Sequence, residues 1–489
     1  MSDSDYKSFK ISSFQSGINE YYSDGIIKPY EAVKAYNCDT SQGSLATFNN
    51  PSIAYTMDNE ISSLTAYYGV SDSTMLIANG NSLSKPDKTK VYDISGAKLD
   101  YLNFEYNGNR ILIGASSEDT PFLYDGNTAR KIKNRRKKYN DEGELCGYID
   151  ANGVEHKTEN TIETYAPKGD FIELHYDRLW IAGDKENPDR VYFSTTNVNG
   201  ADIEDFTVPL AEEEEINMHG GFLDVRSYDG GKIIAMKVIF NSIILFKNKT
   251  AYKIYGSSPS NYQLVQIFSC NGAIADKSIV AGNNGAYYLN SDGIYFYDGT
   301  NTSLVSQKIK KVIASMNKNY ANKAVGSYYD NKYYLAIPTG DSDKNNTLIV
   351  FDVVNNSFTI LHIDNITGFL DYENEIYYSS ENNIKNLFKG KTPLDLYWET
   401  PMYDFLEKTS RKQSETIYFR AKGNGKIKFT LISESKQKEL IVDLTDTEKF
   451  YKKKLKNKGR MFKLIIENVD NSSFELISPE IIFELDSDI

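Results

Sequence analysis

The chain has 489 residues, 40% of them hydrophobic and 25% charged, and it carries a formal net charge of −12. This length predicts two or more domains, and the composition is that of a globular protein. The acidic balance argues against general nucleic-acid binding, and no apolar run is long enough to cross a bilayer or to serve as a signal peptide. The three cysteines and four histidines are scattered, so a zinc site or a disulfide framework is not expected.

Residues 1–60 contain few strong strand patterns and a turn-rich run at residues 37–47. We therefore expect an N-terminal extension that packs on the following domain or closes it.

A short unit recurs between residues 61 and 390. It consists of an aromatic residue, a turn built from Asn, Asp or Gly, and a run of apolar and aromatic residues. Such turns supply the left-handed backbone that hairpins need. The copies lie at residues 68–78, 106–114, 176–183, 240–246, 283–289, 329–337 and 372–378.

A second apolar strand that ends in a tight turn follows several copies, at residues 122–127, 251–256, 293–300 and 348–356. Repeated antiparallel sheets of roughly 40–50 residues are typical of β-propellers. We predict an all-β fold with a six- or seven-bladed propeller over residues 61–390, and one short helix at residues 307–316. The alternative is a pair of β-sandwiches or a β-solenoid in which the periodicity is accidental.

Two polar insertions interrupt the repeats, at residues 131–160 and 201–220. Long polar loops on a rigid scaffold are common binding elements, but they are also common sites of disorder. The first insertion could contact phosphates, or it could be a solvated loop balanced by Asp141, Glu142 and Glu144; the glutamates of the second could contact a partner or be solvated. The candidate interaction residues are Lys131, Lys133, Arg135, Arg136, Lys137, Lys138, Glu212, Glu213, Glu214 and Glu215.

Residues 391–489 follow the repeats and alternate between apolar and polar positions in several short segments. Turns at residues 423–425 and 470–473 separate these segments. The pattern predicts an independent C-terminal β-sandwich.

Motifs for catalysis are missing from the sequence. There is no Ser-x-Asp-x-Gly-x-x-Trp box, no Gly-x-Ser-x-Gly elbow and no glycine-rich loop leading into a helix. Residues 341–352 mimic the spacing of a calcium loop, but Asn346 stands where the turn needs glycine, which favours a solvated hairpin loop. We expect no enzyme activity, no cofactor and no metal.

Residues 169–194 resemble a segment of phage tail propeller proteins, in which a strand is followed by Gly-Asp, a proline-containing turn and an Arg-Val-Tyr-Phe-Ser type strand. Residues 244–256 resemble the next blade of that family, and residues 271–273 with 285–299 resemble the one after. Residues 29–45 are similar to the family's approach to the propeller. The chain thus resembles the tail hub, nozzle and DNA-stabilisation-type propeller proteins of phages and prophages, well over residues 29–311 and loosely beyond.

This resemblance implies a structural protein of the virion tail, made and assembled in the cytoplasm of the host bacterium. It implies a ring of identical copies, often six, that contacts other tail or connector proteins and passing DNA without sequence specificity, and no membrane. The alternative is a baseplate-associated or fibre-associated propeller that recognises a host surface glycan or protein. A wall-degrading enzyme is a third hypothesis, and it predicts a carboxylate pair in the central pocket.

Overall fold

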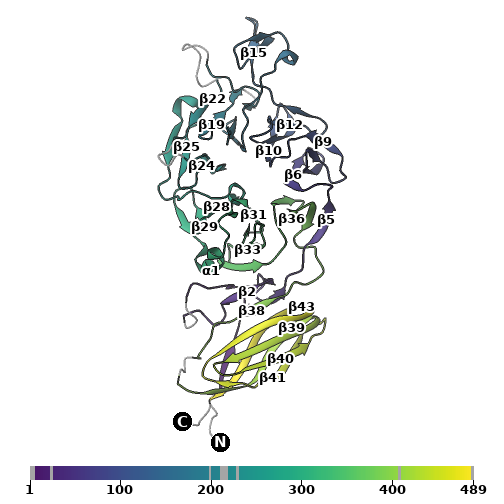
Figure 1. Cartoon of the computed structure of the whole chain (residues 1–489), viewed down its shortest axis with the longest axis vertical. Helices are drawn as coiled ribbons and strands as arrows, with labels where there is room; N and C mark the ends of the chain where they lie inside the picture. The colour runs from purple at the N-terminus through teal and green to yellow at the C-terminus, as the bar shows by residue number, and fades with distance from the viewer. Residues whose placement is uncertain are drawn as a thin grey trace.

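The computed structural model describes residues 6–22, 26–197, 200–209, 219–226, 231–405 and 409–485. The molecule is elongated and all-β. A ring of small sheets forms its middle, a three-stranded sheet projects from one end, and a β domain that holds both chain termini forms the other end (Figure 1). Within these ranges no helix is long and apolar enough to span a membrane.

The ring consists of seven four-stranded antiparallel sheets, and this propeller-like arrangement agrees with the predicted repeats (Figure 1). The first three sheets are β6 (Ile61–Tyr68), β7 (Ser73–Asn79), β8 (Ser82–Ser84) and β9 (Lys90–Asp93); β10 (Asp100–Tyr106), β11 (Asn109–Ala115), β12 (Phe122–Tyr124) and β13 (Ala129–Lys131); and β17 (Phe171–His175), β18 (Arg178–Ala182), β19 (Arg190–Phe193) and β22 (Gly221–Asp224).

The next three sheets follow without long insertions. They are β23 (Ala235–Ile239), β24 (Ser242–Phe246), β25 (Ala251–Tyr255) and β26 (Gln263–Gln266); β27 (Val280–Gly282), β28 (Gly285–Asn290), β29 (Gly293–Tyr297) and β30 (Thr302–Leu304); and β31 (Val325–Tyr329), β32 (Lys332–Ile337), β33 (Thr347–Asp352) and β34 (Ser357–Leu361).

The seventh sheet joins two distant parts of the chain. Strands β35 (Gly368–Tyr372), β36 (Glu375–Ser380) and β37 (Asn383–Asn386) are completed by β5 (Ser52–Thr56) from the N-terminal segment. The first strands β6, β10, β17 and β23 contact one another in order, as do β27, β31, β35 and β6. A shared hydrophobic cluster joins the sheets of β24 and β28, so the ring closes.

The recurring turns identified in the sequence connect the first and second strands of several sheets. The two-residue loops Tyr176–Asp177, Asp330–Asn331 and Glu373–Asn374 have positive φ at both positions, as a tight hairpin requires. The second strand lies inside its sheet and is buried on both faces, as all five residues of β18 and of β24 are. This double burial explains why the sequence shows continuous apolar runs there instead of alternation.

Among the described residues, helical structure is confined to short segments. The 3-10 turn η5 (Ser306–Ile309) and the helix α1 (Lys310–Ala314) confirm the helix predicted at residues 307–316. The other short turns are η1 (Glu159–Thr161), η3 (Pro259–Asn261), η4 (Asp276–Ser278) and η6 (Ala321–Lys323).

The terminal β domain is built from both ends of the chain, whereas the sequence predicted an independent sandwich over residues 391–489. Its sheet has ten strands, and the N-terminal ones lie hydrogen-bonded among those from the C-terminal segment. The strands are β1 (Tyr6–Lys10), β2 (Lys34–Tyr36), β3 (Cys38–Asp39), β4 (Leu45–Thr47), β38 (Tyr397–Glu399), β39 (Lys412–Ser433), β40 (Gln437–Asp443), β41 (Lys449–Lys454), β42 (Lys458–Gly459) and β43 (Phe462–Leu485). The sequence did not predict this pairing between the two ends of the chain, because no local sequence pattern marks strands that pair over such a long separation.

Strands β39 and β43 pair along their length and fold over to form two layers. Phe419 and Phe429 lie on one strand, yet their ring centroids are 4.9 Å apart. Ten residues of straight strand would separate them by about 33 Å. Phe462 and Phe483 at the two ends of β43 are likewise 4.8 Å apart, so both strands bend around a shared apolar core.

The bend of β39 lies at two glycines. Gly425 has φ +116°, and a Cβ at Gly423 would lie 2.3 Å from the backbone oxygen of Ser473. We expect Gly423→Ala to lower the free energy of unfolding of this domain by more than about 1 kcal/mol, because the clash is with backbone that cannot move aside. Urea unfolding of the variant checks this, with Ala421→Gly as a control on the same strand; an unchanged transition for Gly423→Ala would show that the bend can relax.

Candidate functional site

The first polar insertion forms a three-stranded sheet that projects from the ring at the end opposite the chain termini (Figure 1). Its strands are β14 (Arg135–Tyr139), β15 (Leu145–Asp150) and β16 (Glu155–His156). The structure therefore corrects the expectation of a polar loop over this segment. The sheet has no apolar core of its own: its buried positions are Arg135, Gly147 and Asp150.

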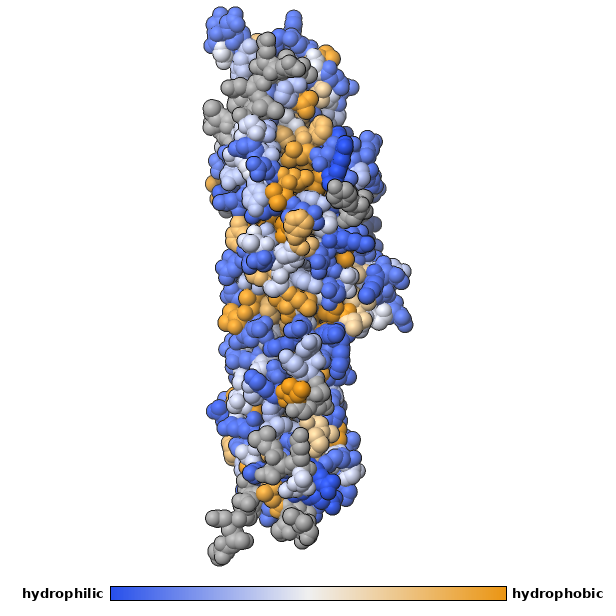
Figure 2. All heavy atoms as spheres, turned by 90° about the vertical axis from the view of Figure 1, so that its left-hand side faces the viewer, coloured by the Kyte–Doolittle hydropathy of each residue, from blue (hydrophilic) through white to orange (hydrophobic). Residues whose placement is uncertain are grey.

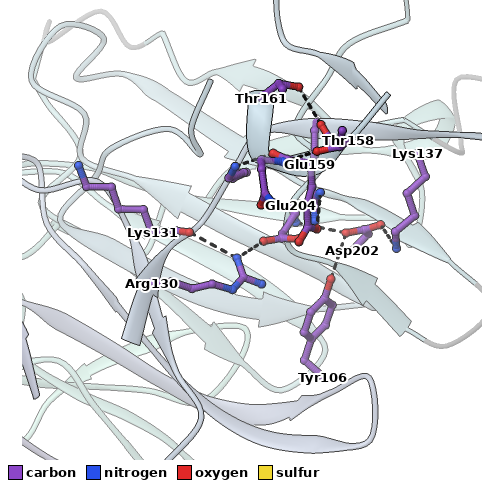
Figure 3. A network of polar contacts seen from close by, with 12 residues as sticks. Tyr106, Arg130, Lys131, Lys137, Thr158, Glu159, Thr161, Asp202 and Glu204 are labelled. Atoms are coloured by element: carbon purple, nitrogen blue, oxygen red, sulfur yellow. Dashed lines mark hydrogen bonds and ion pairs between the residues drawn. The ribbon is translucent and has the colours of Figure 1, made fainter. Parts of the chain in front are cut away.

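A buried ion pair anchors this sheet to the ring. Arg135 Nη2 lies 2.6 Å from Glu204 Oε2, and the two side chains are 7% and 6% exposed. Glu204 also binds Arg130 from β13 (Figure 3). Arg135 binds Glu159 at 2.8 Å. Burial alone would raise the pKa of Glu204, but the two guanidinium groups outweigh it and hold that pKa below its usual value.

The other basic residues of this run also find partners inside the molecule. Lys137 pairs with Asp202 at 3.1 Å, and Lys138 pairs with Glu155 at 2.6 Å. Lys133 donates to the backbone oxygen of Glu159 at 2.6 Å, Arg136 donates to Thr207 and Val208, and Lys131 lies over the ring of Tyr165. The neighbouring acidic residues Asp141, Glu142 and Glu144 are not these partners. Carboxylates pair with Arg135, Lys137 and Lys138, and the other three cations contact uncharged groups of the same molecule, so this run is a poor phosphate-binding surface.

Asp205 lies in the same segment as Glu204 and is buried. Burial raises its pKa to about 6, although the side chain and backbone of Thr207 donate hydrogen bonds to its carboxylate.

Two short strands, β20 (Thr195–Asn197) and β21 (Gly200–Asp202), precede this segment. Glu212, Glu213, Glu214 and Glu215 lie outside the described residues.

A cavity of about 1060 Å³ opens at the centre of the ring, and loops from all seven sheets line it. Its lining is strongly charged, and among the described residues Phe171 is the one aromatic side chain. A small-molecule site is usually mostly apolar with a few placed polar groups, whereas charged side chains make up much of this lining. Several lining carboxylates are already bound: Glu118 pairs with Lys185, and Asp276 lies 3.7 Å from Lys98.

A charge network beside this cavity ties three sheets and the turn η4 together. Asp100 binds Lys277 at 2.7 Å and lies 3.9 Å from Lys237, while Lys237 binds Glu173 at 2.9 Å. Burial alone would raise the pKa of Asp100, but the two ammonium groups lower it to about 2. Asp100 also accepts a hydrogen bond from the backbone amide of Ile172, so it links three chain segments.

The segment with calcium-loop spacing has ordinary hairpin contacts. The Asn345 amide donates to the backbone oxygens of Lys323 and Ile366, and Asn346 binds Thr339. Across the described residues no group of three or more His, Cys, Asp or Glu side chains could hold a metal ion.

A second basic run, at residues 449–460, was missed by the sequence analysis. It contains seven Lys or Arg in twelve residues, a density visible in the printed sequence, and its first half forms the exposed strand β41. Whether a basic run is free or neutralised depends on contacts that only the fold reveals.

Comparison with known proteins gives no family. No protein-family model and no curated protein matches the sequence. Among solved structures the chain is similar to the extracellular domain of the putative one component system BT4673 from B. thetaiotaomicron, at 10% identity and a TM-score of 0.41, over 83% of this chain and 47% of that one. It is also similar to PorZ of the type-IX secretion system of Porphyromonas gingivalis, at 9% identity and a TM-score of 0.37, over 83% and 46%.

A third similar structure is an exo-beta-1,3-galactanase from Phanerochaete chrysosporium, at 7% identity and a TM-score of 0.25, over 80% of this chain and 98% of that one. The chain spans about half the length of the first two structures. At these identities and scores none of the three carries an argument about function. The class of the protein rests on its own fold, an all-β molecule with a propeller-like ring and a two-layered β domain.

Proposed function

We propose that this chain is a structural, non-enzymatic component of a phage or phage-derived tail, and that it acts as a complete seven-bladed β-propeller in an oligomeric ring such as a hub or nozzle. In the virion tail it would contact further copies of itself and other tail or connector proteins. The feature that supports an assembly role best is the exposed apolar edge of the fourth sheet.

That edge is strand β26 and the residues just after it. Leu264 is 37% exposed, Val265 43% and Phe268 86%. Strand β26 pairs only with β25 among the described strands, so its outer backbone groups are also available. Figure 2 looks onto this side of the molecule and shows apolar groups gathered between polar ones. An exposed apolar edge strand is a pairing site unless something covers it.

The shape of the molecule also supports assembly. The projecting sheet and the terminal β domain lie at opposite ends of the long axis, so one copy offers separate surfaces for different neighbours (Figure 1). A heterologous contact between the apolar edge of one copy and another surface of the next copy generates a ring when the rotation between copies closes.

The first test is the mass and image of the purified chain. We expect oligomers by mass photometry and rings by electron microscopy, and we expect Val265→Glu with Phe268→Ser to shift the chain toward monomer by at least about tenfold in dissociation constant. Val354→Ser, which removes another exposed apolar side chain (76% exposed), is the matched control. A chain that stays monomeric at every concentration and occupies a peripheral position in its particle would contradict the proposal.

A receptor-binding propeller is the second candidate function. It is favoured by three exposed apolar side chains on the projecting sheet, namely Tyr139 (56%), Leu145 (47%) and Val154 (52%). Tyr139 and Leu145 are cross-strand partners, so they form one patch at the tip. This candidate predicts that the isolated chain binds host cells and that Tyr139→Ser with Leu145→Ser abolishes binding without changing oligomer mass.

A further inference from the structure

The strand β41 forms a concentrated cationic edge on the terminal β domain, which we call the lysine edge and define as residues 449–456. It carries Lys449, Lys452, Lys453, Lys454 and Lys456, and Lys458 and Arg460 follow directly. Strand β41 pairs only with β39 among the described strands, so its other side faces outward. This density is unusual in a chain whose net charge is −12.

Four of the five lysine ammonium groups of this edge are available to a ligand. Lys449, Lys452, Lys453 and Lys454 are exposed, and in the part of the chain that the structure describes no carboxylate lies within ion-pair distance of any of them. Lys456 does pair with Glu415, at 2.9 Å. The contrast with the run at residues 131–138 is direct, because there Arg135, Lys137 and Lys138 are held by carboxylates of the same molecule.

The strand is held in a fixed orientation. Tyr451 stacks on Phe419 in the domain core, with ring centroids 5.0 Å apart and planes 10° apart. Because side chains alternate along a strand, Phe450, Lys452 and Lys454 therefore share the opposite, outward face. Lys452 Nζ lies 5.4 Å from the ring centre of Tyr418. The ring of Phe450 also contacts Tyr418, with centroids 6.0 Å apart, and Phe450 is nevertheless 66% exposed.

Lysine on an edge strand also discourages unwanted strand pairing, and that role needs few residues. It does not account for the continuation of the basic run to Lys456, Lys458 and Arg460, beyond the last residue of the strand. It also does not account for a large aromatic ring left exposed among the lysines. Cations next to an exposed aromatic ring are the combination that binds single-stranded nucleic acid, through phosphate contacts and base stacking.

We propose that the lysine edge binds the phosphate backbone of nucleic acid without sequence preference, with Phe450 as a stacking platform that favours single strands. An acidic polypeptide would use the charges but would leave the exposed ring of Phe450 without a role. Lysine ammonium groups act as point charges and do not impose a geometry, which suits a backbone of repeating phosphates. The inference does not rest on the tail role, because the edge lies on the terminal β domain, away from the apolar edge of the fourth sheet.

The test measures binding of a fluorescent oligo-dT and of a duplex of the same length to the full chain, as a function of salt. We expect binding at about 50 mM salt that weakens steeply on salt addition. The variant Lys452→Gln/Lys453→Gln/Lys454→Gln should bind the single strand at least about tenfold more weakly, and its log–log salt slope should be smaller by about 2. Phe450→Ser should weaken single-strand binding by more than duplex binding.

A matched control removes three lysines elsewhere. Lys88, Lys90 and Lys389 are exposed and pair with Asp58, Asp93 and Glu375, so their triple change to Gln alters net charge equally. This control should bind like the unmodified chain. Equal losses in both triple variants, or no binding at low salt, would overturn the proposal. Oligomer mass is recorded for each variant: a lysine-edge variant that loses self-association but never bound oligonucleotide would assign the edge to contact between copies instead.

Discussion

We expect that replacing Glu204 by alanine lowers the free energy of local opening of the projecting sheet by about 3–5 kcal/mol. Glu204 is buried and binds both Arg130 and Arg135, and Arg135 is itself buried. Without the carboxylate, the Arg135 guanidinium is left in the interior with only Glu159, which is 54% exposed, as a charged partner. The sheet has no apolar core to compensate for this loss, and a small sheet of this kind is marginal alone.

Hydrogen exchange over residues 133–166 measures this effect, because local opening exposes those backbone amides while the ring stays folded. Glu204→Gln, which keeps a hydrogen-bond acceptor, should lose less protection than Glu204→Ala. The control is Glu155→Ala, which breaks the exposed pair with Lys138 and should change stability by less than about 1 kcal/mol. Wild-type protection in Glu204→Ala would mean that the sheet is held by other contacts.

Replacing Asp100 by asparagine is expected to destabilise the ring by about 3–5 kcal/mol. The change removes the carboxylate that binds Lys277. It also removes one of the two carboxylates that pair with Lys237, which keeps its pair with Glu173. The sheet that contains β10 is then no longer linked by charge to the sheet of β23 or to the turn η4, whereas Lys237 and Glu173 still join the sheets of β23 and β17. Asparagine keeps the size and an acceptor for the Ile172 amide, so the effect reports on charge.

The two tryptophans allow this effect to be followed in one domain. Trp180 lies in the ring and Trp398 in the terminal β domain, and both are fully buried. In a Trp398→Phe background, Trp180 fluorescence during urea unfolding reports on the ring alone. Asp93→Asn serves as the control, because the side chain of Asp93 is 79% exposed. If Asp100→Asn unfolds at the same urea concentration as its parent, the network does not stabilise the ring.

The same residue predicts a pH dependence. The pKa of Asp100 is about 2 in the folded chain, below its value of about 3.9 in an unfolded one. The unfolded state therefore binds more protons between these values, and stability falls as the pH drops from about 4 through 2. At about 1.4 kcal/mol for each pKa unit, this contribution is about 2–3 kcal/mol above pH 4. When the unmodified chain and Asp100→Asn are each unfolded in urea from about pH 4 to pH 2, the free energy of unfolding of the variant should fall less than that of the unmodified chain.

Asp205 acts in the opposite sense. The pKa of Asp205 is about 6 in the folded chain, which is above its value in an unfolded chain. Its contribution to the free energy of unfolding is therefore fully present below about pH 4 and is lost as the pH rises through 6. We expect protection of the segment around Asp205 to fall over this window in hydrogen exchange, and Asp205→Asn to remove the fall. Because the windows of Asp100 and Asp205 barely overlap, the two effects can be separated by pH alone.

Local sequence patterns were enough to identify the ring of sheets. Turns such as Asp330–Asn331 need positive φ, which favours Asn, Asp and Gly. Strands that are buried on both faces have continuous apolar runs, as β32 largely does, and strands that are buried on one face alternate between apolar and polar residues. These signals act between residues that are close in the chain, so they can be recognised from a single sequence. The short helix at residues 307–316 was predictable for the same reason.

Tertiary structure decided how the chain ends are used and which charges are free. Tyr6 pairs with Glu484 and Thr56 with Asn383, so both the terminal domain and the last sheet depend on contacts across almost the whole chain. Arg135 pairs with Glu204, which lies 69 residues away in the sequence, and Lys137 pairs with Asp202, so part of the first basic run is neutralised by distant carboxylates. On the lysine edge Lys456 pairs with Glu415, whereas Lys449, Lys452, Lys453 and Lys454 make no ion pair among the described residues. The sequence by itself therefore determined the repeating hairpins, which follow from local backbone preferences, whereas the distribution of unpaired charge depended on long-range packing.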